Sequence, residues 1–110
     1  MKTRFDTTTG VAVIAPEGDI TVDTSPQLNT VCEKLVAEGA VKMVIDLARV
    51  AYIDSSGLAT LVAILKKLKM HQGQLKVAAI SAKVRGLFEI TKLDKLFGIY
   101  ASEEEALKSF

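Results

Sequence analysis

Residues 41–80, VKMVIDLARVAYIDSSGLATLVAILKKLKMHQGQLKVAAI, decide the fold because they place a helix pattern between two strand patterns. Residues 41–47 are short and rich in branched apolar side chains, as expected of a strand covered on both faces. From Gly57, apolar residues recur at helical spacing, which predicts an amphipathic helix ending near Gly73. Residues 75–80 have the pattern of a second buried strand. Strand, helix and strand in this order predict a parallel pair joined by a right-handed crossover.

Three more strands are predicted outside this unit. Residues 3–8 and 11–15 are strand-like, and a turn at Thr9 and Gly10 predicts that they pair in antiparallel fashion. Residues 97–101 form the last predicted strand. The order ββαβαβαβα indicates one α/β domain spanning residues 1–110, with a parallel sheet and an antiparallel N-terminal addition.

Serine residues mark the expected starts of the other helices. Ser25 is expected to cap a helix that carries Pro26 at its first position, where proline is tolerated, and Gly39 supplies the stop. Ser81 is expected to cap the next helix. Ser102, with a glutamate three residues later, makes a capping box for a terminal helix.

Composition excludes several classes of function. The chain is 49% hydrophobic, its net charge is only +1, and no basic stripe or aromatic series for nucleic acid is visible. The longest apolar stretch, residues 58–65, is far short of a membrane span, and the N-terminus shows no apolar signal region, so we expect a cytoplasmic protein. The single cysteine, Cys32, excludes an internal disulfide and is expected to be a small buried hydrophobe.

Residues 52–58, YIDSSGL, place a carboxylate and two hydroxyls where a central strand connects to a helix. Open α/β sheets bind ligands at this end of their strands. A helix cap accounts for Asp54 or Ser55, but not for Gly57, which costs up to about 1 kcal/mol relative to alanine inside a helix. Close approach of another backbone would explain that glycine. A cap alone and a functional site both remain open at this level.

Enzymatic readings of the serine pair fail on spacing. The nucleophile motif Gly-x-Ser-x-Gly is absent, because Ile53 and Asp54 stand two residues before Ser55 and Ser56. The only histidine, His71, follows Ser55 by a helical rise of roughly 24 Å. No phosphate-binding glycine motif is present, and Asp54 would repel an anionic ligand. We therefore expect no enzyme and no metal site.

A modification site remains. A phosphate on a serine at a helix N-terminus adds about −1.5 to −2 charges where the helix dipole tolerates them, so the fold should survive. A partner with an acidic or tightly packed surface would lose affinity, since each 1.4 kcal/mol is about a tenfold change. One phosphate would then switch binding off.

The stretch VIDLARVAYIDSSGLATLVAILKKLKMHQGQLKVAAISAKVRGLFEITKL, residues 44–93, resembles the STAS-domain family, specifically the bacterial anti-sigma factor antagonists. The similarity extends from VAVIAPEGDI to the last helix, and DSSGL after VIDL is its most specific part. It implies a five-stranded mixed sheet with four helices.

The resemblance also implies a partner-switching cycle without a cofactor. The unphosphorylated protein binds an anti-sigma factor that is also a serine kinase, phosphorylation at Ser55 breaks the complex, and a phosphoserine phosphatase resets it. Relatives often carry an acidic residue where this chain has Thr21. The expected partner-binding residues are Asp19, Thr21, Asp23, Asp54, Ser55, Ser56, Gly57 and Leu58.

Two hypotheses follow. The first is a phosphorylation-switched binding module that is monomeric when free and binds neither nucleic acid nor membrane. The second is a STAS scaffold or ligand-sensing module of a larger regulatory assembly, without phosphorylation at Ser55.

Overall fold

Five strands and four α-helices alternate in the computed structural model, which describes residues 1–110. In chain order the elements are β1 (Lys2–Asp6), β2 (Val11–Ala15), α1 (Ser25–Ala37), β3 (Lys42–Asp46), α2 (Ser55–Met70), β4 (Gln74–Ala78), α3 (Ala82–Ile90), the short 3-10 helix η1 (Leu93–Lys95), β5 (Gly98–Tyr100) and α4 (Glu103–Lys108).

The five strands form one mixed sheet in the order β1-β2-β3-β4-β5. β1 pairs with β2 in antiparallel fashion, and every other neighbouring pair is parallel. The predicted fold class, including the crossover from β3 through α2 to β4, is therefore confirmed.

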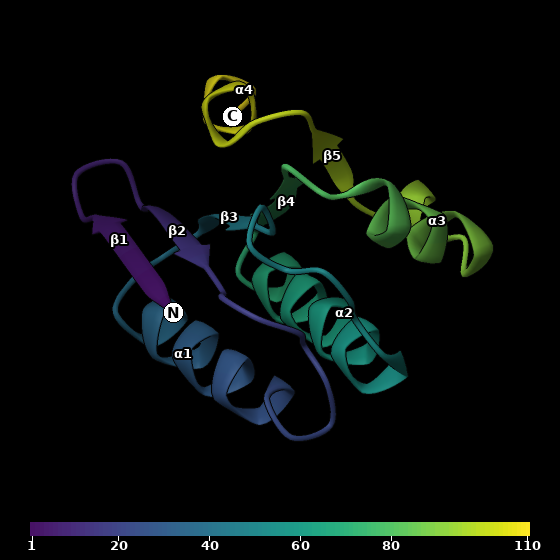
Figure 1. Cartoon of the computed structure of the whole chain (residues 1–110). Helices are drawn as coiled ribbons and strands as arrows, with labels where there is room; N and C mark the ends of the chain where they lie inside the picture. Colours follow the sequence, from purple (N-terminus) through teal and green to yellow (C-terminus); the bar gives the residue numbers. More distant parts are fainter.

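Helices cover both faces of the sheet unequally. α1 and α2 lie side by side under the sheet, α3 lies toward β5, and α4 lies alone on the other side (Figure 1). Side chains of α1, α2 and α3 share the large core of 22 buried residues, whereas Ala106 of α4 joins a second cluster of four. β3 contributes Met43 and Ile45 to the first and Val44 to the second, as expected of a strand buried on both faces.

The first strand ends earlier than predicted. β1 stops at Asp6 rather than at residue 8, because the turn begins at once. The Asp6 carboxylate accepts the N–H of Thr8 at 2.9 Å, and the Asp6 carbonyl accepts the N–H of Gly10 at 2.9 Å. Gly10 has φ +73°, a conformation that glycine adopts without strain.

Two predicted helix caps are confirmed, the choice between Asp54 and Ser55 is decided in favour of Asp54, and one predicted cap is wrong. Asp54, Ser81 and Ser102 each accept a backbone N–H of the first turn with a side-chain oxygen. Ser25 is instead the first, buried residue of α1 and caps nothing. The cap position belongs to Thr24, whose hydroxyl bonds back into the preceding loop rather than to the helix.

No helix has both the length and the apolar character needed to cross a membrane.

Candidate functional site

The start of α2 lies beyond the carboxyl end of β3, where the connecting loop reaches Asp54. This residue is the N-cap, in extended conformation, and its Oδ1 accepts the N–H of Gly57 at 2.9 Å. Its carbonyl accepts the N–H of Leu58 at 3.0 Å. Asp54 is therefore the cap of α2, and the Ser55 hydroxyl is not needed to cap the helix.

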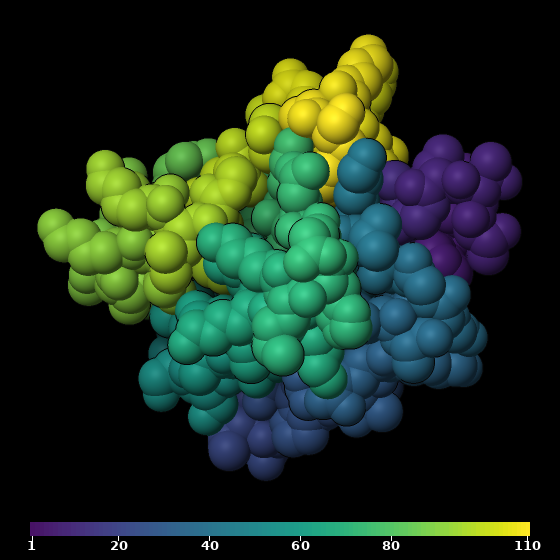
Figure 2. Space-filling view, turned by 180° about the vertical axis from the view of Figure 1, so that it is seen from behind, coloured from purple at the N-terminus to yellow at the C-terminus, as the bar shows by residue number.

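A second loop, between β2 and α1, is fastened to this helix start. Ile20 forms an isolated parallel bridge with Ile53: its N–H donates to the carbonyl of Tyr52, and its carbonyl accepts the N–H of Asp54, both at 3.0 Å. The N–H of Val22 donates to Oδ2 of Asp54 at 3.0 Å. Figure 2 shows the segment near residue 20 bordering the start of α2 at the lower edge of the molecule. One carboxylate therefore caps a helix and ties two loops together.

Gly57 is required by the close approach of this second loop. A Cβ at this position would lie 2.7 Å from the carbonyl oxygen of Ile20 and 2.6 Å from Cγ2 of Ile53. Both distances are shorter than real Cβ contacts allow. The predicted approach of another backbone is confirmed.

The two serines differ in exposure. Ser55 is exposed and Ser56 is half-buried. None of the side-chain hydrogen bonds around the site uses the Ser55 hydroxyl. Gly57 and Leu58, also expected to contact a partner, are buried, so they support the site from below.

The predicted residues of the β2–α1 loop surround the same helix start. Asp19 and Asp23 are exposed, and Thr21 is half-buried. The Thr21 hydroxyl accepts the N–H of Asp23 at 3.3 Å, and the Thr21 N–H donates to Thr24 Oγ1 at 2.8 Å. The structure therefore gathers all eight predicted residues, and Thr21 has a role in holding the loop.

Three neighbours were missed by sequence reasoning. Val22 and Tyr52 are large apolar residues that stay 63% and 38% exposed. Lys83 of α3 places its Nζ 5.2 Å from the centroid of the Tyr52 ring. Val22 lies between two predicted residues and Tyr52 lies two positions before Asp54. The sequence pattern of an apolar residue, however, does not reveal that its side chain faces solvent.

Nucleophilic chemistry finds no support at this site. His71 lies at the opposite end of the 16-residue helix α2. The nearby carboxylate, Asp54, already accepts an N–H on each oxygen, so it is poorly placed to take a proton from Ser55. No cluster of metal-ligating side chains occurs in the structure. Burial, with a smaller effect of the Glu33 charge, raises the pKa of Cys32 to about 12, which keeps its thiol protonated.

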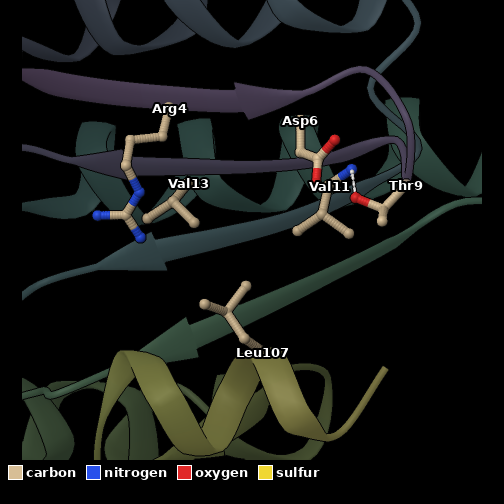
Figure 3. A pocket seen from close by; sticks show the side chains of 6 residues that line it. All are labelled: Arg4, Asp6, Thr9, Val11, Val13 and Leu107. Atoms are coloured by element: carbon tan, nitrogen blue, oxygen red, sulfur yellow. Dashed lines mark hydrogen bonds between the residues drawn. The ribbon is translucent and has the colours of Figure 1, made fainter.

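A hollow lies elsewhere, on the α4 side of the sheet (Figure 3). Its volume is about 250 Å³. The side chain of Arg4, which borders it, is ion-paired with Glu103 of α4. The full lining consists of Arg4, Asp6, Thr9, Val11, Val13 and Leu107.

Known proteins resemble this chain over nearly its whole length. The family model described as the STAS domain matches residues 2–106. BtrV of Bordetella bronchiseptica is 30% identical over 110 residues, covering 100% of this chain and 95% of that protein. An anti-sigma-B factor antagonist of Staphylococcus epidermidis is 33% identical over 87 residues, covering 79% of this chain and 81% of that protein. The crystal structure of an anti-sigma factor antagonist from Mycobacterium paratuberculosis is 32% identical, with a TM-score of 0.84 over 98% of this chain and 92% of that one.

Proposed function

This chain belongs to the STAS domain family, and we propose that it is an anti-sigma factor antagonist switched by phosphorylation of Ser55. In its unphosphorylated form it binds an anti-sigma factor that is also a serine kinase, which releases a sigma factor. Phosphate on Ser55 breaks this complex, and a phosphoserine phosphatase restores binding. The protein itself is not an enzyme and acts in the cytoplasm, where sigma factors work.

The observation that carries this proposal is the position of the Ser55 hydroxyl. It is exposed at the first residue of a 16-residue helix whose cap is supplied by Asp54. A phosphate here therefore breaks no hydrogen bond of the fold and lies at the positive end of the helix dipole. The domain can accept the charge while its surface changes.

The other five serines are less suitable acceptors. Ser25 is buried and Ser56 is half-buried. The hydroxyls of Ser81 and Ser102 cap α3 and α4, so a phosphate would disturb a helix start. The last serine, which follows α4, accepts a hydrogen bond from a lysine of β4. Ser55 is exposed, and its hydroxyl makes no hydrogen bond within the fold.

The partner surface is proposed to surround Ser55. Asp19 and Asp23 are exposed at the edge of this surface, and Ser56 is half-buried there. Thr21 holds the loop that carries the two aspartates. Gly57 and Leu58 act by fixing the helix start beneath them.

Incubation with ATP and the anti-sigma factor kinase of the same genome tests the proposal. Mass spectrometry should map the phosphate to Ser55; Ser55→Ala should abolish labelling, and the matched control Ser56→Ala should keep it. Ser55→Ala should retain binding, whereas Ser55→Asp should weaken it about tenfold or more. Phosphate on another residue, or undiminished labelling of Ser55→Ala, would refute the assignment.

The hollow in Figure 3 favours a second candidate, a ligand-sensing STAS module. Its volume of about 250 Å³ would hold only a small molecule. In that case the kinase assay would give no phosphate on Ser55. A small molecule found by screening would raise the unfolding temperature of the wild type, and Val13→Phe, which fills the hollow, would abolish that rise.

A further inference from the structure

Two of the exposed large apolar residues, Val22 and Tyr52, flank the start of α2. Six large apolar side chains are exposed on the molecule. Val22 and Tyr52 are the pair that stand on the two loops joined at Asp54. We call these two residues the Val22–Tyr52 patch. Large apolar side chains that stay exposed around one helix start are a feature of interaction sites.

Both residues of the patch are held in place before any partner arrives. The backbone of Val22 is fixed by its hydrogen bond to Asp54, and the carbonyl of Tyr52 accepts the N–H of Ile20. The Tyr52 ring also has the Lys83 ammonium 5.2 Å from its centroid. A preorganised contact loses less conformational freedom on binding, so more of its burial appears as affinity.

Charged residues form a rim around the patch. Asp19, Asp23 and Lys83 are exposed, and none belongs to any of the three ion pairs of the molecule. An apolar centre with a charged rim is the usual anatomy of a protein–protein contact. Because two of these charges are carboxylates, the complementary partner surface carries basic groups opposite them.

This charge distribution bears on how the phosphate acts. A partner with an acidic surface would already be repelled by Asp19 and Asp23, so repulsion by the partner's own carboxylates does not explain a switch. The partner's basic groups lie opposite Asp19 and Asp23, so a dianion on Ser55 would instead face the apolar centre of the contact. It would have to lose its water when that centre is covered. Burying an unpaired charge is strongly unfavourable.

We infer that the anti-sigma factor covers Val22 and Tyr52 with an apolar surface bordered by basic groups, and that phosphate on Ser55 prevents docking because it cannot be dehydrated there. This inference rests on the proposed function.

The binding contribution is tested by Val22→Ser and Tyr52→Ser, with Met70→Ser and Ile90→Ser as controls. The control residues are 79% and 80% exposed. They are the last residues of α2 and α3, at the ends of these helices opposite Ser55 and Lys83. The probe is the kinase that labels Ser55, titrated calorimetrically, with circular dichroism to verify folding. Each patch variant should raise Kd about tenfold or more, and each control should stay within about twofold.

The two proposals fail in different ways. If the patch variants bind like the wild type while Ser55→Asp still binds weakly, the patch is wrong and the Ser55 switch stands. If the wild type neither binds the kinase nor receives phosphate, the proposed function is wrong, and this inference falls with it.

Salt separates dehydration from repulsion. The ratio of Kd for Ser55→Asp to Kd for the wild type should change less than about threefold between roughly 50 and 500 mM NaCl, since a desolvation penalty is weakly screened. A ratio that collapses about tenfold or more would show that screened repulsion operates and would overturn the dehydration mechanism.

Discussion

Oδ2 of Asp54 accepts the backbone N–H of Val22 at 3.0 Å, although 32 positions separate the two residues in the chain. The other carboxylate oxygen of Asp54 accepts the N–H of Gly57. A residue that looks like a simple helix cap therefore also sets where the β2–α1 loop lies. Any change at Asp54 should affect stability and the surface around Ser55 together.

Asp54→Ala should destabilise the domain by about 1–3 kcal/mol, because it removes a helix cap and leaves the N–H of Val22 without its partner. Urea denaturation measures the effect. Asp54→Asn, which keeps one acceptor oxygen, should lose less. The surface control Asp19→Ala should stay within about 0.5 kcal/mol. Equal stability of the wild type and Asp54→Ala would show that the link between the loops carries no stability.

Gly57→Ala and Gly86→Ala should have opposite effects although both glycines lie inside helices. A Cβ at Gly57 would meet the Ile20 backbone, whereas nothing lies within 4 Å of one at Gly86. Gly57→Ala should cost about 1–3 kcal/mol through overpacking, which outweighs its gain in helix propensity.

Gly86→Ala should instead gain about 0.4–1 kcal/mol. Thermal unfolding of both variants checks the pair. Stabilisation by Gly57→Ala would mean that the β2–α1 loop yields easily and that the close approach is not a constraint.

Ser55→Ala should leave the free energy of unfolding unchanged within about 0.5 kcal/mol, since its hydroxyl supports no part of the fold. Ser81→Ala and Ser102→Ala remove confirmed caps and should each cost about 1 kcal/mol. Chemical denaturation of the three variants side by side tests this contrast. A loss at Ser55 as large as that at Ser81 would reveal a structural role and weaken the case for a free acceptor.

Burial of Cys32 should make stability depend on alkaline pH. Its pKa rises from 9.0 to about 12 in the folded protein. Between pH 9 and about 12 the folded state therefore keeps the thiol proton that the unfolded state has released. The contribution of this thiol to the free energy of unfolding is complete below pH 9 and is lost as the pH rises toward 12.

Comparing the wild type with Cys32→Ala isolates this contribution, because all other side chains that titrate at alkaline pH are present in both proteins. The wild type should lose stability more steeply above pH 9, and a thiol reagent should label Cys32 only on unfolding. Parallel pH curves, or rapid labelling of the native protein, would contradict the burial of this thiol.

Most of the helices and strands, and the family, could be predicted from local sequence patterns. Apolar periodicity reports which side of a strand or helix is buried, so β3, α2 and β4 could be predicted from residues 41–80. A cap depends on residues within one turn, which is why Ser81 and Ser102 were predicted correctly and the cap of α2 could be narrowed to Asp54 or Ser55. At Gly57, a glycine inside a helix indicates that another part of the chain packs closely against it, but it does not identify that part.

Local patterns could not predict which loop approaches Gly57 or which side chains stay exposed to solvent there. The contact of Ile20 with Gly57 and the bond from Val22 to Asp54 join segments more than thirty positions apart. Ser25 was wrongly predicted as a cap because Thr24 is bound into that same loop. Local patterns encode burial along one element, but exposure at a meeting of loops depends on how separate elements pack, and that is settled by the whole fold.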